Sequence, residues 1–541
     1  MSSTNAFPES GCLSTRRHLL RIAISAPLGI AALRATHYGG AAEGSFNQAR
    51  AGKQLNYHPE GLYVWDSWYF TKGEEAHVIH LQKRRPSSKL PDRNDGALGH
   101  AVSTDLLTWK ELAPALYRGP EGSIDDMDLF TGWTTEYQGK YYLFYTARMM
   151  REKGLLQRLC LATSEDTISW TKHPEPVIVP DPRWYAASDC RDLVIHRHPQ
   201  TGEFHGFYAA ARLRKELVER PVIAHVRSRD LIHWTHEPPA FIPSSDYGVV
   251  EVPDVFSLDG RWWMICATGN FDGVRSGYND PYIVMGTIYA GSERLEGPYR
   301  EASDNVLMGS MEFNGFSCRS LVWKGRRYVL HSQSERRDRQ DRGSGTLGSL
   351  STPKEIRVSR EGKLRLMYSP LIEQRINVDL IAGPTPPRLD EAGGLRFGTP
   401  GEWRVEAGEA RAVSPESWSV RLCGPEAESF IWTAELRLEK GRATGLLFRQ
   451  WLAVLLDFQE QCVMFTHLPW MFRLDARRVR LELGRPYRLR LVAKAEFFEA
   501  YLDDVLVLNF VRYQPPKGRF GLYLEKGEGT FANLRAVSLN V

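Results

Sequence analysis

The sequence is poor in cysteine, and its cysteines form no pattern. There are 7 among 541 residues, with no Cys-x-x-Cys pair and no spacing typical of a zinc site. One lies within the first 45 residues, and the others stand singly at Cys160, Cys190, Cys266, Cys318, Cys423 and Cys462. We therefore predict small core residues at these positions, with no disulfide framework and no metal site built on cysteine.

An excess of charge of one sign is also lacking. The chain carries 69 Lys and Arg against 65 Asp and Glu, a formal net charge of +4. A protein that follows a phosphate backbone needs a marked basic excess. Nucleic acid is therefore not an expected partner. The 11% of aromatic residues suit a β-rich fold and also suit surfaces that cover sugar rings.

Long hydrophobic runs are scarce outside the N-terminus. Residues 14–20 read Ser-Thr-Arg-Arg-His-Leu-Leu and resemble a twin-arginine export signal. The apolar stretch that follows, over residues 19–33, is too short and too interrupted to span a bilayer. We expect residues 1–45 to be an export signal and flexible N-terminus, which predicts a periplasmic or extracellular protein without membrane insertion.

What the sequence does have is an internal repeat. The phrase Ser-x-Asp-x-x-x-Trp begins three times, in steps of 61 and 64 residues, at Ser103, Ser164 and Ser228. A glycine before an aromatic-rich alternating segment recurs in steps of 66, 63, 58 and 65 residues, at Gly73, Gly139, Gly202, Gly260 and Gly325. Five copies of one multi-strand unit with tight turns predict an all-β fold, a five-bladed β-propeller over residues 50–380. The Ser-x-Asp phrase is present in several copies, so we interpret it as a structural turn.

The pattern changes after residue 380. Residues 382–387 read Ala-Gly-Pro-Thr-Pro-Pro, which is typical of a linker. Segments 487–492 and 505–508 alternate or run apolar between turn residues, and this predicts an antiparallel β-sandwich over residues 395–541. For this second domain we favour structural support of the propeller, with an accessory sugar-binding surface as the alternative.

Acidic residues recur at similar distances before the repeated glycines. Asp66 precedes Gly73 by seven residues, and three further acids precede their own glycines by eleven, ten and nine residues, namely Asp128, Asp192 and Glu251. If these positions lie on the innermost strands, the acids meet at the centre of the propeller. Such a cluster suits glycosidic chemistry, in which one carboxyl donates a proton while another stays ionised. A structural ion pair, as in Arg191-Asp192, is the plainer alternative for any single acid.

At these residues the sequence resembles glycoside hydrolase family 32, the invertase, levanase and inulinase family. The resemblance runs from about residue 57 to the end. It is carried by segments 99–109, 129–133, 190–192, 251–256 and 345–356, of which 190–192 is similar to the family's Arg-Asp-Pro motif and 251–256 to its Glu-Cys-Pro motif. The first motif departs from the family: Asn-Asp-Pro-Asn-Gly is replaced by Trp65-Asp66-Ser67-Trp68-Tyr69, which keeps only the acid.

The resemblance implies a retaining hydrolase of fructan-like or other furanoside oligosaccharides or polysaccharides. It makes Asp66 the nucleophile, Asp192 the stabiliser of the transition state and Glu251 the general acid/base. Arg191 would hydrogen-bond the sugar, and neither a cofactor nor a metal is implied. We add Asp128 to the substrate-binding candidates, and Trp65 with Trp68, because they replace the motif that shapes the family's sugar subsite.

Two alternative hypotheses of function remain. An inverting propeller hydrolase of the arabinofuranosidase or xylosidase type also uses two Asp and one Glu, with the carboxyls about 6.5 to 9.5 Å apart instead of about 5 to 5.5 Å. A non-catalytic propeller that binds glycans is the third reading. The sugar, the linkage and the oligomeric state are not legible in the sequence.

Overall fold

The structure is a computed structural model that describes residues 55–540, apart from 153, 214–219, 245–246, 270–281, 312–313, 382–388, 392–400, 407–408, 450 and 469–471. The predicted export signal and the linker at 382–387 lie outside the described residues. The six cysteines beyond the N-terminal segment are buried. Among the described helices, none has the length and apolar character needed to cross a membrane.

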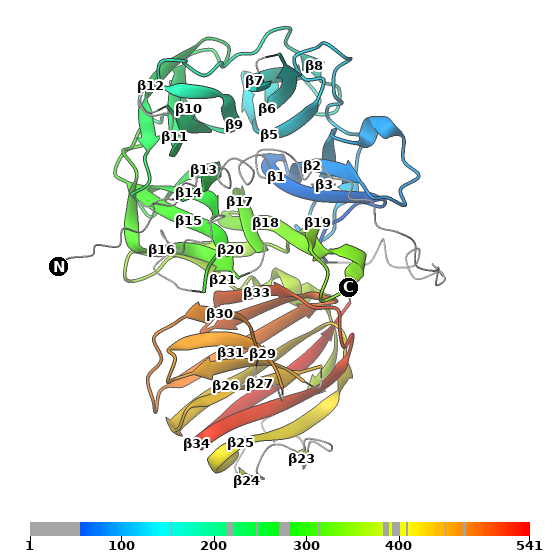
Figure 1. Ribbon diagram of the computed structural model, residues 1–541, viewed down its shortest axis with the longest axis vertical. Helices are drawn as coiled ribbons and strands as arrows, with labels where there is room; N and C mark the ends of the chain where they lie inside the picture. The colour runs from blue at the N-terminus through cyan, green and yellow to red at the C-terminus, as the bar shows by residue number, and fades with distance from the viewer. Residues whose placement is uncertain are drawn as a thin grey trace, which may run out of the picture.

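The N-terminal part is a ring of five antiparallel blades, as the repeat predicted. Figure 1 shows five groups of strands around a common centre, with β1, β5, β9, β13 and β17 nearest to it. The blades consist, in order, of β1 (Leu62–Lys72), β2 (Glu75–Arg84), β3 (Leu98–Ser103) and β4 (Lys110–Glu111); β5 (Asp128–Tyr137), β6 (Lys140–Arg151), β7 (Gly154–Ser164) and β8 (Thr171–Lys172); β9 (Tyr185–Arg197), β10 (Phe204–Arg212), β11 (Arg220–Ser228) and β12 (Trp234–Phe241); β13 (Val249–Leu258), β14 (Arg261–Gly269), β15 (Met285–Ser292) and β16 (Arg300–Ser310); and β17 (Asn314–Trp323), β18 (Arg326–Arg336), β20 (Lys354–Val358) and β21 (Leu364–Met367).

The repeated phrases are the turns of this ring. The repeated glycines sit between the first two strands of each blade with positive φ, for example 75° at Gly139 and 76° at Gly260, where a side chain would be strained. In the Ser-x-Asp phrase, Ser103 Oγ accepts the N–H of Leu106 at 2.8 Å, and Asp105 accepts the N–H groups two and three residues on. The other two copies repeat these bonds. The structural interpretation of this phrase is confirmed.

A short extra strand closes the ring. The strand β19 (Gly345–Leu350) pairs with β18 of the fifth blade and, through Val64 opposite Gly348, with β1 of the first blade. Tyr57, ahead of β1, adds a bridge to Leu350. Backbone pairing therefore joins the last blade to the first and holds the innermost strands around one axis.

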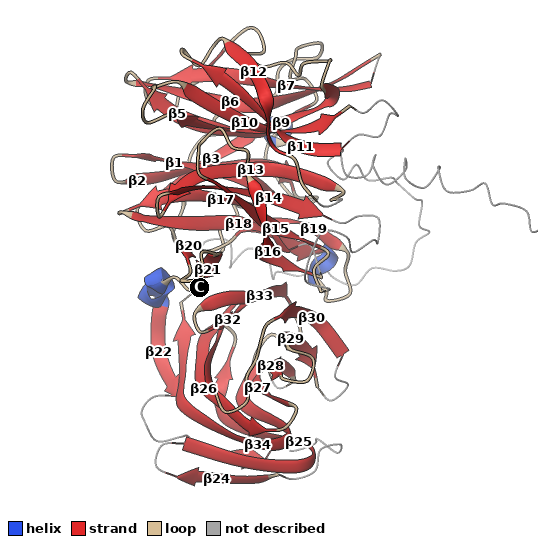
Figure 2. Ribbon diagram, turned by 90° about the vertical axis from the view of Figure 1, so that its left-hand side faces the viewer, coloured by secondary structure: helices blue, strands red, loops and turns tan. Residues whose placement is uncertain are grey.

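The C-terminal part is a β-sandwich, also as predicted, and Figure 2 shows its layers beneath the propeller. Its core includes stacked phenylalanines, with the rings of Phe465 and Phe510 3.7 Å apart. The strands are β22 (Ile376–Ile381), β23 (Asp390–Glu391), β24 (Glu402–Glu406), β25 (Glu409–Ala427), β26 (Phe430–Lys440), β27 (Ala443–Phe448), β28 (Leu452–Asp457), β29 (Cys462–His467), β30 (Phe472–Arg478), β31 (Pro486–Lys494), β32 (Phe497–Leu502), β33 (Val505–Val511) and β34 (Gly518–Leu539).

Propeller and sandwich are joined by buried charges. Lys354 from β20 and Lys494 from β31 each donate to Glu499 Oε1 of β32 at 2.6 Å. Tyr501 donates to the other carboxylate oxygen at 2.7 Å, and the backbone of β21 pairs with β33 close by. Because all three charged side chains are buried, this contact fixes the two parts against each other.

Candidate active site

Every innermost strand carries a β-bulge at the same place. In each one, two consecutive residues lie opposite a single residue of the neighbouring strand. The bulged pairs are Trp65-Asp66, Thr131-Gly132, Asp192-Leu193, Val252-Pro253 and Ser317-Cys318. Bulges bend a strand and redirect its side chains, and they are frequent beside active sites. Five of them around one axis turn polar groups from five blades toward a common point.

Asp66 is the first acid at that point. Ser317 Oγ donates a hydrogen bond to its Oδ1, and Thr131 Oγ1 donates to its Oδ2 at 3.3 Å. Blades one, two and five therefore meet at one carboxylate. Ser67, the hydroxyl next to it in sequence, instead lies against Tyr69 Oη at 2.8 Å.

Asp192 is the second acid, and the backbone holds it. Its residue has φ 64°, in the left-handed region that is uncommon for a residue with a side chain. The N–H of Val252 donates to Asp192 Oδ2 at 3.0 Å, and Thr146 Oγ1 accepts the N–H of Asp192 at 3.1 Å. Arg319, which is fully buried, donates to the Asp192 carbonyl at 3.2 Å.

Glu251 is the third acid, and Arg191 ties it to the second. The Arg191 guanidinium donates to Glu251 Oε2 at 2.8 and 3.1 Å and to Asp189 Oδ1 at 2.8 Å, and it lies 3.5 Å from Asp192 Oδ2. The side chain of Glu251 remains 17% exposed, against 2% for Asp192. Glu251 is thus better placed than Asp192 to exchange a proton with solvent.

Burial and neighbouring charges shift the pKa values of these groups. Burial, together with the charges of Asp192 and Glu251, raises the pKa of Asp66 to about 7, while the hydroxyls of Ser317 and Thr131 oppose the rise. Burial likewise raises the pKa of Asp192, against the opposing charge of Arg191. Burial lowers the pKa of Arg191, but its three carboxylate neighbours outweigh this and raise it overall. A carboxyl that titrates near neutrality beside a fixed guanidinium is an arrangement typical of a reacting site.

The sequence prediction missed the hydroxyls of Thr131 and Ser317 and the guanidinium of Arg319. A signal for the hydroxyls was present. Thr131 and Ser317 each precede their repeat glycine by eight residues, next to the offset of seven at Asp66. Arg319 had no such signal, because a single arginine on an apolar strand does not show which blade it contacts.

Trp68 requires a correction. It was predicted to bind substrate, but its side chain is fully buried in the core shared by the first two blades, with Nε1 donating to Thr134 Oγ1 at 2.9 Å. The bulge at Trp65-Asp66 interrupts the strand alternation, so Trp68 packs into the core although it lies only two residues after Asp66. Trp65, in the bulge beside Asp66, is only half-buried and so keeps a surface that a substrate can reach.

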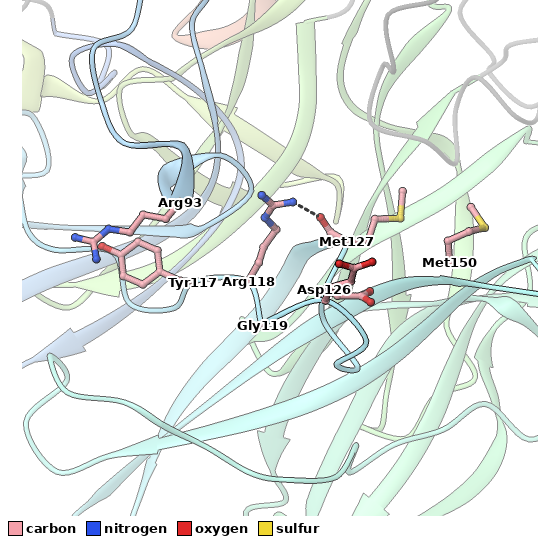
Figure 3. Close-up of a pocket in the computed structure, with 8 residues that line it drawn as sticks. Arg93, Tyr117, Arg118, Gly119, Asp126, Met127 and Met150 are labelled. Carbon is pink, nitrogen blue, oxygen red and sulfur yellow. Dashed lines mark hydrogen bonds between the residues drawn. The ribbon is translucent and has the colours of Figure 1, made fainter.

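Asp128 lies at the start of β5, three residues before the bulge, and forms an ion pair with Arg148 at 3.4 Å. Burial raises its pKa, against the charges of Arg148 and Arg118. The two residues before it help to line a pocket of about 490 Å³ together with Arg93, Tyr117, Arg118, Gly119, Glu121 and Met150. Figure 3 shows Arg118 between Tyr117 and Met127, donating to the Met127 carbonyl at 3.0 Å. Arg93 lies over the Tyr117 ring, 5.0 Å from its centre.

Comparison with known proteins identifies the family and the fold. Residues 91–370 match the model of the glycosyl hydrolases family 32 N-terminal domain. The chain is 25% identical over 300 residues to the insoluble β-fructofuranosidase isoenzyme CWINV6 of Arabidopsis thaliana, and the match covers 51% of each chain. The chain therefore spans about half the length of that curated relative.

Solved structures share the fold over almost the whole length. The sucrose-6-phosphate hydrolase of Lactobacillus gasseri superposes with a TM-score of 0.67 at 14% identity, covering 91% of this chain and 94% of the other. The exo-inulinase of Aspergillus awamori gives 0.65 at 16% identity, covering 91% and 99%. At these identities the likeness establishes the propeller followed by a sandwich.

Proposed function

This chain belongs to glycosyl hydrolase family 32, whose N-terminal domain model matches more than half of it, and on that premise we propose that it hydrolyses fructosidic bonds by a retaining double displacement. The observation that carries the proposal is the convergence of Asp66, Asp192 and Glu251 at bulges of three innermost strands. The names of its relatives point to sucrose and fructans as the substrate class.

In the first step, Asp66 attacks the anomeric carbon as a carboxylate. The bond from that carbon to the leaving oxygen breaks, and the oxygen takes its electron pair together with the proton of Glu251. In the second step water attacks the same carbon, Glu251 accepts the proton of the water, and the ester bond to Asp66 breaks. Two inversions at one carbon retain its configuration.

Arg191 and Asp192 support these steps. The Arg191 guanidinium is anchored on Asp189 and Glu251, so it orients the acid/base and keeps a fixed charge beside the sugar. The Asp192 carboxylate, held by the N–H of Val252, offers negative charge to the oxocarbenium-like transition state. Its backbone is fixed from blades two, four and five, which preserves its position through the reaction.

Substrate beyond the reacting sugar would meet Trp65 and Asp128. Trp65 stands in the same bulge as the nucleophile and offers an aromatic face. Asp128 is three strand residues from Thr131, a separation of about 10 Å, and so suits a neighbouring sugar unit, with the pocket of Arg118 next to it. We also propose export, on the twin-arginine-like residues 14–20.

The test is product formation from sucrose, levan, inulin, arabinan and arylglycosides by the purified chain. Carbon-13 NMR of the first product formed gives the configuration at its anomeric carbon. Release of fructose in the configuration of the substrate supports the proposal. Arabinose or xylose released with inversion would assign the chain to the inverting type, and glycan binding without turnover would make it a binding protein.

A further inference from the structure

The fifth blade contributes a buried hydroxyl to the acid cluster. Ser317 is fully buried in the bulge of β17, and its Oγ donates to Asp66 Oδ1. The other oxygen of Asp66 accepts a hydrogen bond from Thr131, at 3.3 Å. Hydroxyls from two different blades therefore hold the two oxygens of this carboxylate.

The backbone at Ser317 is strained. Its φ is 55°, in the left-handed region, which is unfavourable by about 1 to 2 kcal/mol for a residue with a Cβ and is easy for glycine. Strain of this kind persists where the surrounding structure imposes it, and it gathers at functional sites. Serine at this position adds a hydroxyl that glycine lacks, and that hydroxyl points at Asp66.

The hydroxyl nearest to Asp66 in sequence is not one of its hydrogen-bond donors in the described structure. Asp66 is flanked by Trp65 and Ser67, and the Ser67 hydroxyl is engaged with Tyr69 at 2.8 Å. The hydroxyl donors that the structure shows at the Asp66 carboxylate come instead from blades two and five.

We propose that Ser317 is a positioning residue for the nucleophile, holding Asp66 Oδ1 so that Oδ2 faces the anomeric carbon. The inference rests on the proposed function. When Oδ2 forms the ester, Oδ1 becomes its carbonyl oxygen, and the same hydroxyl donates to it. When water attacks the anomeric carbon, the electron pair of the breaking C–O bond returns to the carboxylate, which Ser317 again stabilises in its ionised form.

The hydroxyl also has a consequence for pH dependence. Burial and neighbouring acids raise the pKa of Asp66, and the hydrogen bonds of Ser317 and Thr131 counteract them. The other charged groups near Asp66 are Asp192, Glu251 and the buried Arg319. Loss of the Ser317 hydroxyl therefore raises the pKa of Asp66 further, and the acid limb of the kcat/KM profile moves to higher pH.

The experiment compares Ser317→Ala and Ser317→Gly with the wild-type protein on the fructoside it hydrolyses best. Both variants should lose about 10- to 100-fold in kcat/KM, as expected for one hydrogen bond to a charged group, mostly in kcat. Both should shift the acid limb upward. Ser317→Gly, which relieves the left-handed strain, should melt at or above the wild-type temperature, so its loss of activity is not a loss of folding.

Ser320→Ala is the matched control. Ser320 lies on the same strand and is buried, and its Oγ accepts from Arg327 at 2.9 Å. The acid that it contacts is Asp254 and not one of the three central acids, so its removal should leave the pH profile unchanged. Wild-type kcat and an unmoved acid limb in both Ser317 variants would overturn the inference while the proposed function stands. No fructoside turnover by the wild-type protein would overturn the proposed function, and the inference with it.

Discussion

Two of the buried charge clusters in the described part of the chain differ in the balance of their charges. At the propeller–sandwich contact, the single carboxylate of Glu499 accepts from Lys354, Lys494 and Tyr501. Burial opposes its charge, but the two ammonium groups outweigh burial and lower the pKa of Glu499. At the centre of the propeller the carboxylates outnumber the cations, and the pKa of Asp66 is raised instead, to about 7.

On the proposed function, this difference distinguishes a structural cluster from a reacting one. Both carboxylate oxygens of Glu499 accept hydrogen bonds, which stabilise its ionised form. The central acids are held in mutual repulsion by five blades, which keeps one of them able to change its charge near neutral pH. On the proposed function, the raised pKa of Asp66 belongs to a reacting carboxylate and the lowered pKa of Glu499 to a structural one.

The largest effect should come from removing the reactive carboxylate. Asp66→Asn keeps the shape and still accepts from Ser317, but it cannot attack carbon as a carboxylate. We expect kcat to fall by roughly 10⁴-fold or more. Initial-rate kinetics on the best fructoside measure it. Residual activity above a hundredth of wild type would rule Asp66 out as nucleophile.

The same variant should gain stability at alkaline pH. Because the folded-state pKa of Asp66 is raised, its contribution to stability is present at low pH and is lost as pH rises through about 7. At pH 8 the wild type carries a half-buried charge that Asp66→Asn lacks, so the free energy of unfolding of the variant should be higher than that of the wild type by about 1 to 4 kcal/mol. The gap should close toward pH 5, as denaturant titrations at both pH values would show.

At the interface the order of effects should reverse. Glu499→Gln leaves Lys354 and Lys494 buried without a counter-charge, so the free energy of unfolding should fall by about 3 to 5 kcal/mol. Activity per folded molecule should stay within about twofold of wild type, because Glu499 touches none of the central acids.

The matched control is Glu528→Gln, at a surface pair with Lys440 at 2.7 Å whose side chains are 42% and 68% exposed. Exposed pairs contribute less than about 1 kcal/mol. If Glu499→Gln and Glu528→Gln had the same unfolding midpoint in urea, the interface cluster would not stabilise the contact between propeller and sandwich.

The five-bladed propeller could be predicted from the repeat, because turn glycines with positive φ recur wherever the same hairpin recurs. Asp66, Asp192 and Glu251 followed from their distance to those glycines. The bulges did not follow, because strands buried on both faces show little hydrophobic alternation, so the shift of phase that one extra residue causes is not visible in the sequence. The error at Trp68 has this origin: the bulge at Trp65-Asp66 shifts the alternation, so a tryptophan two residues after Asp66 enters the core.

The interface cluster was beyond sequence reasoning for another reason. Lys354 and Glu499 are separated by 145 residues, and lysine and glutamate are almost never fully buried unless they are paired. Nothing local distinguishes them from surface charges. Only the docking of β20 against β31 and β32 reveals the pairing.

The smallest effect should come from removing the surplus cation. Burial, together with the charge of Lys354, lowers the pKa of Lys494 to about 8 in spite of Glu499, so the charged form of Lys494 is less favourable in the folded protein than in water. Lys494→Met keeps the packing of the stem, loses the bonds to Glu499 and Thr352, and leaves one balanced pair between Lys354 and Glu499. These changes offset each other, and we expect the free energy of unfolding at pH 7 to change by less than about 1.5 kcal/mol.

The sign of its pH dependence distinguishes this account from a simple lost contact. A lysine whose pKa is lower in the folded state binds fewer protons there, so wild-type stability should gain from Lys494 as pH rises from about 8 toward the ordinary lysine range. Lys494→Met lacks that gain, and the difference between the two proteins in urea midpoint should therefore move in favour of the wild type between pH 7 and pH 10. A difference that stays constant across that range would mean that Lys494 keeps its proton throughout, and that the interface tolerates two cations on one carboxylate without strain.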